Sequence, residues 1–152
     1  MGLPVMSLLA GEYVPSTAQW VRDQVEEYEA SGGARANTLR GGKDPIVVIT
    51  SVGRKSGALR KNPLMRVERG GKYLAVASIG GGPTNPEWYH NFLANPVVEL
   101  QDGPDRRDYS VRLADGEERT AWWERAVEVW PAYADYQEKT DREIPVFVAE
   151  PA

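Results

Sequence analysis

Short runs of β-branched and apolar residues recur along the chain between glycine-rich turns, a pattern typical of strands. We predict strands at residues 46–50, 64–67, 73–77, 97–101, 108–113 and 144–148. The adjacent glycines at 70 and 71 and the Asp102-Gly103 pair are typical of tight hairpin turns, which join antiparallel neighbours. About six mostly antiparallel strands with flanking helices place the chain in the α+β class, as a small β-barrel.

The N-terminal third predicts one amphipathic helix. Ser16 followed by Gln19 has the form of a capping box, and the helix should end at the glycines 32 and 33. Its apolar residues at helical spacing are Trp20, Val21, Val25 and Tyr28. Three roles stay open for this apolar face: it covers the sheet, it covers a substrate pocket, or it rests on a membrane. The acidic opposite face disfavours contact with anionic lipid.

Three further helices follow from capping and periodicity. Asn85 and Pro86 suit the N-cap and first position of a short helix that ends near residue 95. Asp115 is placed to cap the next helix. Pro131 must kink or restart that helix, because its ring removes a backbone donor and clashes with the preceding turn. The restarted piece should run to about residue 139.

Composition excludes several functional classes. The chain has 152 residues and is 41% apolar, which suits one globular domain, with an N-terminal helix and arm over 1–40 and a barrel over 41–152. A formal net charge of −4 argues against nucleic-acid binding. The chain has no cysteine, and its single histidine, His90, cannot build a metal site alone. The apolar stretch 1–10 is too short to span a bilayer and lacks the basic start of an export signal.

A basic turn stands out against this acidic background. Arg54, Lys55, Arg60 and Lys61 bring four positive charges within eight residues, and no acid lies between Pro45 and Glu68. Such a turn can hold an anion through charge-assisted hydrogen bonds, with glycine amides free to approach a phosphate. The alternative is an ordinary solvated surface.

Two groups of aromatic residues can each be interpreted in two ways, as core packing or as part of a ligand site. Trp88, Asn91 and Phe92 share a helix face, which is either core packing or one wall of a pocket. The set Trp130, Tyr133 and Tyr136 repeats every three residues across the break at Pro131. Aromatic stripes are usually core, but buried tyrosine hydroxyls need partners, so a role facing a ligand is the second reading. Together these features indicate an anionic, planar ligand.

Several motifs occur in the order found in one known family. They are the segments 50–57, 59–65, 77–81, 86–91, 94–96 and 140–147. Over residues 40–152 the chain resembles the deazaflavin-dependent nitroreductases and quinone reductases of actinobacteria. The resemblance implies a split β-barrel, similar to flavin-reductase and pyridoxamine-oxidase barrels. It also implies that the reduced deazaflavin coenzyme F420 is bound and passes a hydride to a quinone, a nitroaromatic or a similar acceptor.

The resemblance also assigns roles to residues at the matching positions. The residues implied to bind the cofactor are Arg54, Lys55, Ser56, Gly57, Arg60, Asn62, Pro63, Leu64, Ala77, Ser78, Ile79, Trp88 and Asn91. Ser78, Tyr133 and Tyr136 are implied to lie at the reacting face. Met65, Trp130 and Tyr133 are implied to contact the acceptor. The cofactor carries the hydride chemistry while the protein positions it, which accounts for the absence of a catalytic His or Cys constellation.

Three positions depart from the family pattern. Met65 and Trp130 stand where the best-studied nitroreductases have tyrosine, so two hydroxyls are missing from the acceptor site. This favours planar quinones over bulky nitroimidazoles. Ile79 stands where a lysine would meet the polyglutamate tail of the cofactor, so we expect weaker binding of the tail.

Alternative functions and partners stay open at this point. The main alternative is a non-catalytic binding or carrier protein for a deazaflavin, flavin or haem-like ligand, and a weaker one has flavin mononucleotide in the same groove. We expect a cytoplasmic monomer or weak dimer that reduces a small-molecule acceptor and binds no nucleic acid. Peripheral contact with the inner face of the cell membrane depends on the N-terminal helix.

Overall fold

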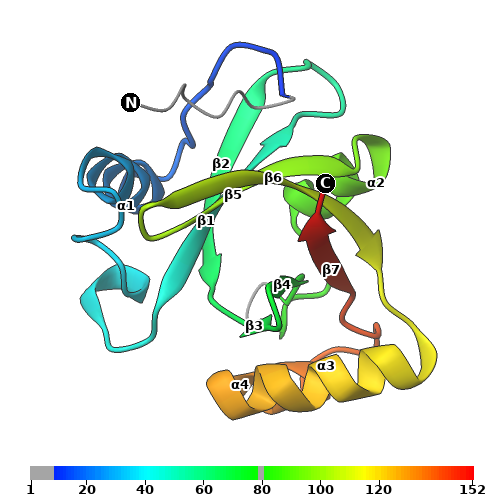
Figure 1. Ribbon diagram of the computed structural model, residues 1–152. Coiled ribbons are helices and arrows are strands. Elements are labelled where there is room, and N and C mark those ends of the chain that lie inside the picture. The colour runs from blue at the N-terminus through cyan, green and yellow to red at the C-terminus, as the bar shows by residue number, and fades with distance from the viewer. Residues whose placement is uncertain (1–8, 79–80) are drawn as a thin grey trace.

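Seven antiparallel strands form one sheet that curls into a half-barrel in the computed structural model, which describes residues 9–78 and 81–152 (Figure 1). The strands are β1 (Ile46–Val52), β2 (Leu59–Met65), β3 (Glu68–Arg69), β4 (Lys72–Val76), β5 (Val97–Asp102), β6 (Asp105–Leu113) and β7 (Val146–Pro151). Their order is β2-β1-β5-β6-β7-β4-β3, and each neighbouring pair is antiparallel. The predicted α+β class with a curled antiparallel sheet is confirmed. The seventh strand is the two-residue β3, which the apolar pattern does not mark.

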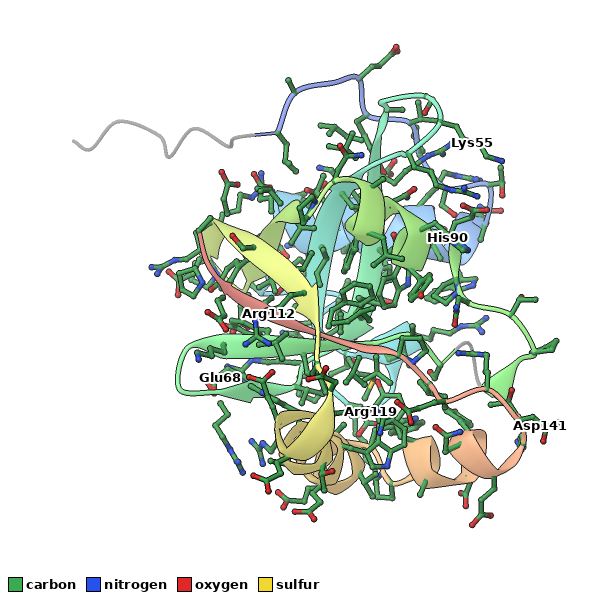
Figure 2. The ribbon with its side chains drawn as sticks, turned by 90° about the vertical axis from the view of Figure 1, so that its right-hand side faces the viewer. Lys55, Glu68, His90, Arg112, Arg119 and Asp141 are labelled. Carbon is green, nitrogen blue, oxygen red and sulfur yellow. The ribbon has the colours of Figure 1, made fainter. Side chains whose placement is uncertain are left out.

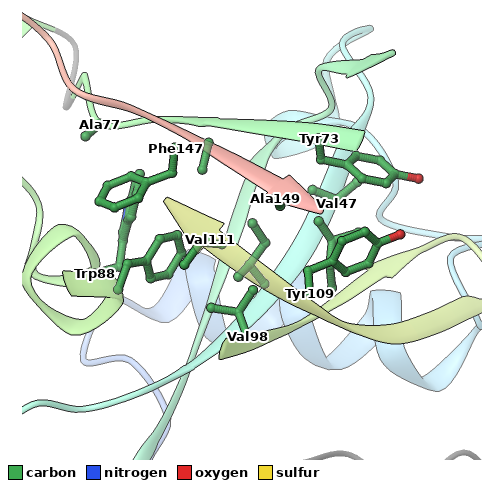
Figure 3. Packing of buried hydrophobic residues seen from close by; sticks show 13 residues of the cluster. Val47, Tyr73, Ala77, Trp88, Val98, Tyr109, Val111, Phe147 and Ala149 are labelled. Carbon is green, nitrogen blue, oxygen red and sulfur yellow. The ribbon is translucent and has the colours of Figure 1, made fainter. Parts of the chain in front are cut away.

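Side chains on the inner face of the sheet fill the half-barrel. Val47 and Ile49 of β1 point inward, while Ile46 and Val48 between them point outward, as the alternation of a strand requires. Phe147 of β7 lies among the rings of the interior cluster (Figure 3). Because both faces of β1 are buried, its sequence is a continuous apolar run.

Helix α1 (Gln19–Ala30) covers the outer face of β1. Val25 and Tyr28 of the helix are buried against Ile46 and Val48 of the strand. The Tyr28 hydroxyl accepts a hydrogen bond from Gly103 N–H at 2.7 Å and donates one to a neighbouring carbonyl, so the helix is fixed to the β5–β6 turn. The expectation that this helix covers the sheet is confirmed.

Two further helices, packed as a pair, cover the other end of the sheet (Figure 1). Helix α3 (Gly116–Val129) and helix α4 (Ala132–Glu138) are separated by the break at Pro131, as predicted. Trp122 and Tyr133 pack from these helices onto the outward side chains of β4 and β7. Helix α2 (Glu87–Ala94) instead plugs the interior of the half-barrel with its buried ring side chains. A short 3₁₀ turn, η1 (Leu39–Gly41), precedes β1.

Local predictions at three boundaries are wrong. The second strand begins at Leu59, so Arg60 and Lys61 lie on a strand and not in the turn. The N-cap of α1 is Ala18, and Ser16 only accepts a hydrogen bond from the Ala18 N–H. The N-cap of α2 is Pro86. Among residues 9–78 and 81–152, no helix is long and apolar enough to cross a membrane. Residues 1–8 of the apolar N-terminal stretch lie outside the described part.

Candidate active site

The β1–β2 turn is built by a tight backbone circuit. Gly53 N–H donates to the Ala58 carbonyl at 2.7 Å, and Gly57 N–H donates to the Gly53 carbonyl at 2.9 Å. Gly57 has a φ of +73°, which favours glycine. The Asn91 side chain of α2 accepts a hydrogen bond from the Arg54 N–H at 3.0 Å. Helix α2 therefore holds the turn in place while the basic side chains of the turn remain exposed.

A groove opens beside this turn, and we call it the basic groove. Its volume is about 620 Å³. It is lined by Ser16, Thr17, Gly53, Arg54, Lys55, Ser56, Arg60, Lys61, Asn62, Pro86, Glu87, Trp88 and Asn91. Lys55 lies at the end of the molecule opposite α3 and α4 (Figure 2).

One of the four predicted cations is already neutralised. Lys61 Nζ lies 2.5 Å from Glu29 Oε2 of α1, and the two side chains are only 15% and 19% exposed. The Lys61 ammonium also lies 4.8 Å from the ring centroid of Tyr13. Because Lys61 is committed to these contacts, it ties α1 and the N-terminal arm to the sheet and contributes little free charge to the groove.

The other three cations remain available to an anion. In the described part of the chain, Lys55 and Arg60 form no ion pair, and Arg54 has only a loose one, 3.8 Å from the exposed Glu87. Arg60 donates a hydrogen bond to the Val14 carbonyl at 3.3 Å, which leaves its charge uncompensated. The mouth of the groove therefore carries a surplus of positive charge despite the acidic composition of the protein.

A second hollow lies beside the first and reaches α4, and we call it the aromatic pocket. Its volume is about 310 Å³. It is lined by Trp20, Val21, Leu39, Asn62, Pro63, Leu64, Met65, Val76, Ser78, Pro86, Trp88, Trp130, Tyr133 and Tyr136. Asn62, Pro86 and Trp88 line both hollows, so the two adjoin, and we call them together the cleft.

Tyr133 is a buried tyrosine that lines the aromatic pocket. It is 5% exposed, and its ring meets the ring of Tyr136 edge-on with centroids 6.1 Å apart. Within the residues that the structure describes, its hydroxyl has no hydrogen-bond partner. Burial, and to a smaller extent Tyr136, raises the pKa of Tyr133 above its ordinary value, because the charged phenolate would be poorly solvated. Tyr133 therefore stays protonated at neutral pH and can donate a hydrogen bond to a ligand.

The structure brings together most of the residues singled out from the sequence. Those at the basic groove alone are Arg54, Lys55, Ser56, Arg60 and Asn91, whereas Asn62 and Trp88 lie at both hollows. Those at the aromatic pocket alone are Pro63, Leu64, Met65, Ser78, Trp130, Tyr133 and Tyr136. Trp88 and Tyr133 are buried and also form pocket walls, so core packing and pocket lining do not exclude each other for these aromatic groups.

Two of the singled-out residues do not line the cleft, and a third falls outside the residues that the structure describes. Gly57 shapes the turn through its backbone. Ala77 is fully buried in the interior cluster and does not line the cleft in this structure, and its expected place along the cofactor ring stays a prediction. Ile79 lies outside the described residues.

Sequence reasoning missed the contribution of the N-terminal third. Ser16 and Thr17 line the basic groove, and Trp20, Val21 and Leu39 line the aromatic pocket. The periodicity of the N-terminal helix gave the available signal, since covering a pocket was one of its expected roles. The pattern does not show which of its apolar residues would stay uncovered. In residues 9–78 and 81–152, no cluster of three or more His, Cys, Asp or Glu residues is placed to hold a metal ion.

A curled antiparallel half-barrel with a cationic groove beside an aromatic pocket fits the class of proteins that bind planar, anionic cofactors. Residues 20–151 match the model of the F420H(2)-dependent quinone reductase family, and the chain belongs to that family. An F420H(2)-dependent quinone reductase of Mycobacterium tuberculosis is 36% identical over 110 residues, which are 70% of this chain and 74% of the relative.

Solved structures agree with this assignment. An F420-H2-dependent reductase (FDR-A) is 56% identical, with a TM-score of 0.67 over 70% of this chain and 94% of that one. A protein described as a domain-swapped dimer is 48% identical, with a TM-score of 0.70 over 89% of this chain and all of that one. The predicted family, enzyme class and cofactor are confirmed: the protein is an oxidoreductase that depends on reduced F420.

Proposed function

We propose that the cleft holds F420 with its phosphate-bearing arm in the basic groove and that a planar quinone is reduced in the aromatic pocket. The observation that carries this proposal is that the two hollows adjoin at Asn62, Pro86 and Trp88. A single elongated ligand can therefore be anionic at one end and planar at the other. Lys55 and Arg60 fit a phosphate, because neither is paired with an acid in the described part of the chain.

The backbone of the turn supports the same assignment. A Cβ at Gly53 would lie 3.1 Å from Ser56 Oγ and 3.2 Å from the Ala58 carbonyl, so a larger residue would distort the turn. Ser56 Oγ accepts a hydrogen bond from the Ala58 N–H at 3.1 Å. The Lys55 and Ser56 side chains are exposed beside this rigid frame. A phosphate there would meet a cation and a hydroxyl at fixed positions.

Reduced F420 supplies the hydride when it is bound, and the protein supplies position and polarity. Trp88 and Pro86 form walls at the junction of the two hollows, where they exclude water. The Tyr133 hydroxyl, held protonated by burial, donates a hydrogen bond to an acceptor oxygen that gains negative charge. Ser78 lines the same pocket as a second hydroxyl. Such donors stabilise the transition state more than the ground state, which raises turnover.

The pocket walls favour a quinone over a bulkier acceptor. Met65 and Trp130 bring apolar surface where hydroxyls would otherwise bind polar groups, and the pocket volume is about 310 Å³. A flat ring that stacks on aromatic walls fits this lining. We propose that nitroaromatic compounds are poorer acceptors, limited by the missing hydroxyls.

The test is the oxidation of reduced F420, followed by the loss of its absorbance, with menadione as acceptor and a nitroimidazole in parallel. We expect rapid turnover with menadione and much slower turnover with the nitroimidazole. Binding of F420 without any oxidation by menadione would support the carrier alternative. A titration with flavin mononucleotide tests the remaining alternative, and flavin binding as tight as F420 binding would contradict the cofactor assignment in this groove.

Membrane contact and oligomeric state are two further proposals. Contact with a membrane surface would use Trp20, which is 39% exposed, because the rest of the apolar face of α1 packs on the sheet. Cosedimentation with lipid vesicles that is lost in Trp20→Ala would support it, and no cosedimentation of the wild type would contradict it. A monomer or weak dimer is expected, which sedimentation analysis over a range of concentrations tests.

A further inference from the structure

One half-buried arginine holds the loop between β4 and α2 by four hydrogen bonds. Arg142 Nε donates to the Gly82 carbonyl at 3.0 Å, and Nη2 donates to the Ser78 carbonyl at 2.9 Å. Nη1 donates to the Ala77 carbonyl at 3.1 Å and to Asn85 Oδ1 at 2.8 Å. The guanidinium thus contacts both described parts of the loop, 77–78 and 81–85. The side chain of Asn85 thus binds Arg142, and α2 has no side-chain cap.

The segment that carries Arg142 is in turn fixed to α4. Gln137 Nε2 donates to the Arg142 carbonyl at 2.8 Å, and Gln137 Oε1 accepts from the Ile144 N–H at 2.9 Å. The loop also touches α4 directly at Gly81, which has a φ of +82°. A Cβ at Gly81 would lie 2.8 Å from the Tyr136 carbonyl oxygen, closer than any side chain tolerates.

These contacts connect two walls of the aromatic pocket that belong to different parts of the chain. Ser78 follows β4, whereas Tyr133 lies on α4, and both line the pocket. We propose that Arg142 is a positioning residue that fixes the separation of Ser78 and Tyr133 across the acceptor site. This inference rests on the proposed function, since it assigns the acceptor to that pocket.

The chemistry of the guanidinium explains why arginine suits this position. Arg142 has no acidic partner within the described residues, and its donors go to three carbonyls and one amide oxygen instead. A planar group with five fixed N–H donors sets the mutual position of several acceptors, whereas a lysine ammonium cannot reach four separate oxygens at once. Burial lowers the pKa of Arg142, although the guanidinium remains charged at neutral pH.

The experiment compares Arg142→Gln and Arg142→Lys with Arg112→Gln. Arg112 is the matched control because it also makes several side-chain hydrogen bonds, to Glu118 and Glu150, but on the exposed side of β6 away from the cleft (Figure 2). Two readouts are needed: amide hydrogen exchange at Gly81, whose N–H donates to the Ser78 carbonyl, and the steady-state constants with menadione. F420 affinity is measured alongside.

In both Arg142 variants we expect faster exchange at Gly81 as the local hydrogen bonds open more often. We expect kcat/KM for menadione to fall by about ten- to a hundredfold, since small misplacements of positioning groups cost rate on this order. F420 affinity should change less than about threefold, because the basic groove keeps its own hydrogen bonds. The control should leave all three quantities unchanged.

Gly81→Ala provides an independent test if the Arg142 variants fold poorly, because it pushes the loop away from α4 without removing the arginine. It should lower kcat/KM in the same way. Restoration of wild-type values by Arg142→Lys would show that only charge matters and would overturn the inference, as would Arg142→Gln behaving like the Arg112 control. If the wild type fails to reduce menadione, the proposed function is refuted, while the exchange comparison still reports whether Arg142 fixes the loop.

Discussion

We predict that the cations of the basic groove contribute unequally to F420 binding. Replacing Lys55 or Arg60 with Ala should weaken F420 binding, because each has a charge that no acid compensates within the described residues. Replacing Lys61 with Ala should weaken it far less, because that ammonium is bound to Glu29. Glu29 would keep a partner in the Lys61 variant, since Arg106 Nη2 lies 3.1 Å from the same carboxylate oxygen.

The magnitude follows from the exposure of these groups. A hydrogen bond to a charged group contributes about 1.5–3 kcal/mol. Lys55 is exposed and Arg60 is half-buried, so water screens both and the lower end of that range applies. A loss of about 1.5 kcal/mol corresponds to an affinity about tenfold weaker for each single variant. The Lys61 variant should lose less than about threefold, because its ammonium is already bound to Glu29 and only a weak, screened attraction to the phosphate is removed.

The assay is a fluorescence titration of F420 at low and high salt, repeated with the deazaflavin riboside that lacks the phosphodiester. The losses in the Lys55 and Arg60 variants should shrink at high salt, because counterions screen exposed charges. They should disappear with the riboside, which has no phosphate to bind. Equal losses for the riboside would refute the assignment of the phosphate to this groove, as would wild-type affinity in both variants or a full loss in the Lys61 variant.

Three further predictions concern the aromatic pocket. Tyr133→Phe should lower menadione turnover clearly and leave F420 affinity within about twofold. The control Tyr109→Phe should not lower turnover, because Tyr109 is equally buried at 5% exposure but lies in the interior cluster. Equal effects of the two substitutions would show a loss of packing and not of a hydrogen-bond donor. The double variant Met65→Tyr with Trp130→Tyr should raise activity on nitroimidazoles by restoring two hydroxyls, and unchanged activity would mean that volume limits the pocket. The pKa of Tyr133 is raised in the folded state, so the free energy of unfolding falls as pH rises above the unfolded pKa near 10. Chemical denaturation over this pH range should show a shallower fall of that free energy in Tyr133→Phe. An identical fall in the variant and the wild type would contradict the pKa shift.

The fold was predictable wherever a strand or helix buries a face. β1, β4 and β6 have apolar runs or alternation, and their positions follow from the sequence. β2 was misjudged at its start because it is an edge strand whose second and third residues, Arg60 and Lys61, are charged. Pro63 is tolerated there for the same reason, since an edge strand has a side without a ladder partner.

The candidate site was predictable where one segment supplies both the backbone frame and the functional groups, as the β1–β2 turn does. It was not predictable where distant segments meet. The pairing of Lys61 with Glu29 depends on where α1 docks. The hydrogen bonds of Arg142 depend on a contact across more than fifty residues of sequence. A single sequence contains no signal for such contacts, because they arise only from the closed sheet.

The place of β7 in the sheet has a consequence for biosynthesis. The last strand of the chain lies between β6 and β4, so it is the element that joins β3 and β4 to the rest of the sheet. Until Val146–Pro151 has left the ribosome, the nascent chain has two incomplete sheet fragments with unpaired edges, which invite association with other chains. The aromatic pocket, which β4 and α4 help to line, can therefore form only after β7 has been synthesised, and a chain that terminates before β7 should be recovered as an aggregate rather than as an inactive monomer.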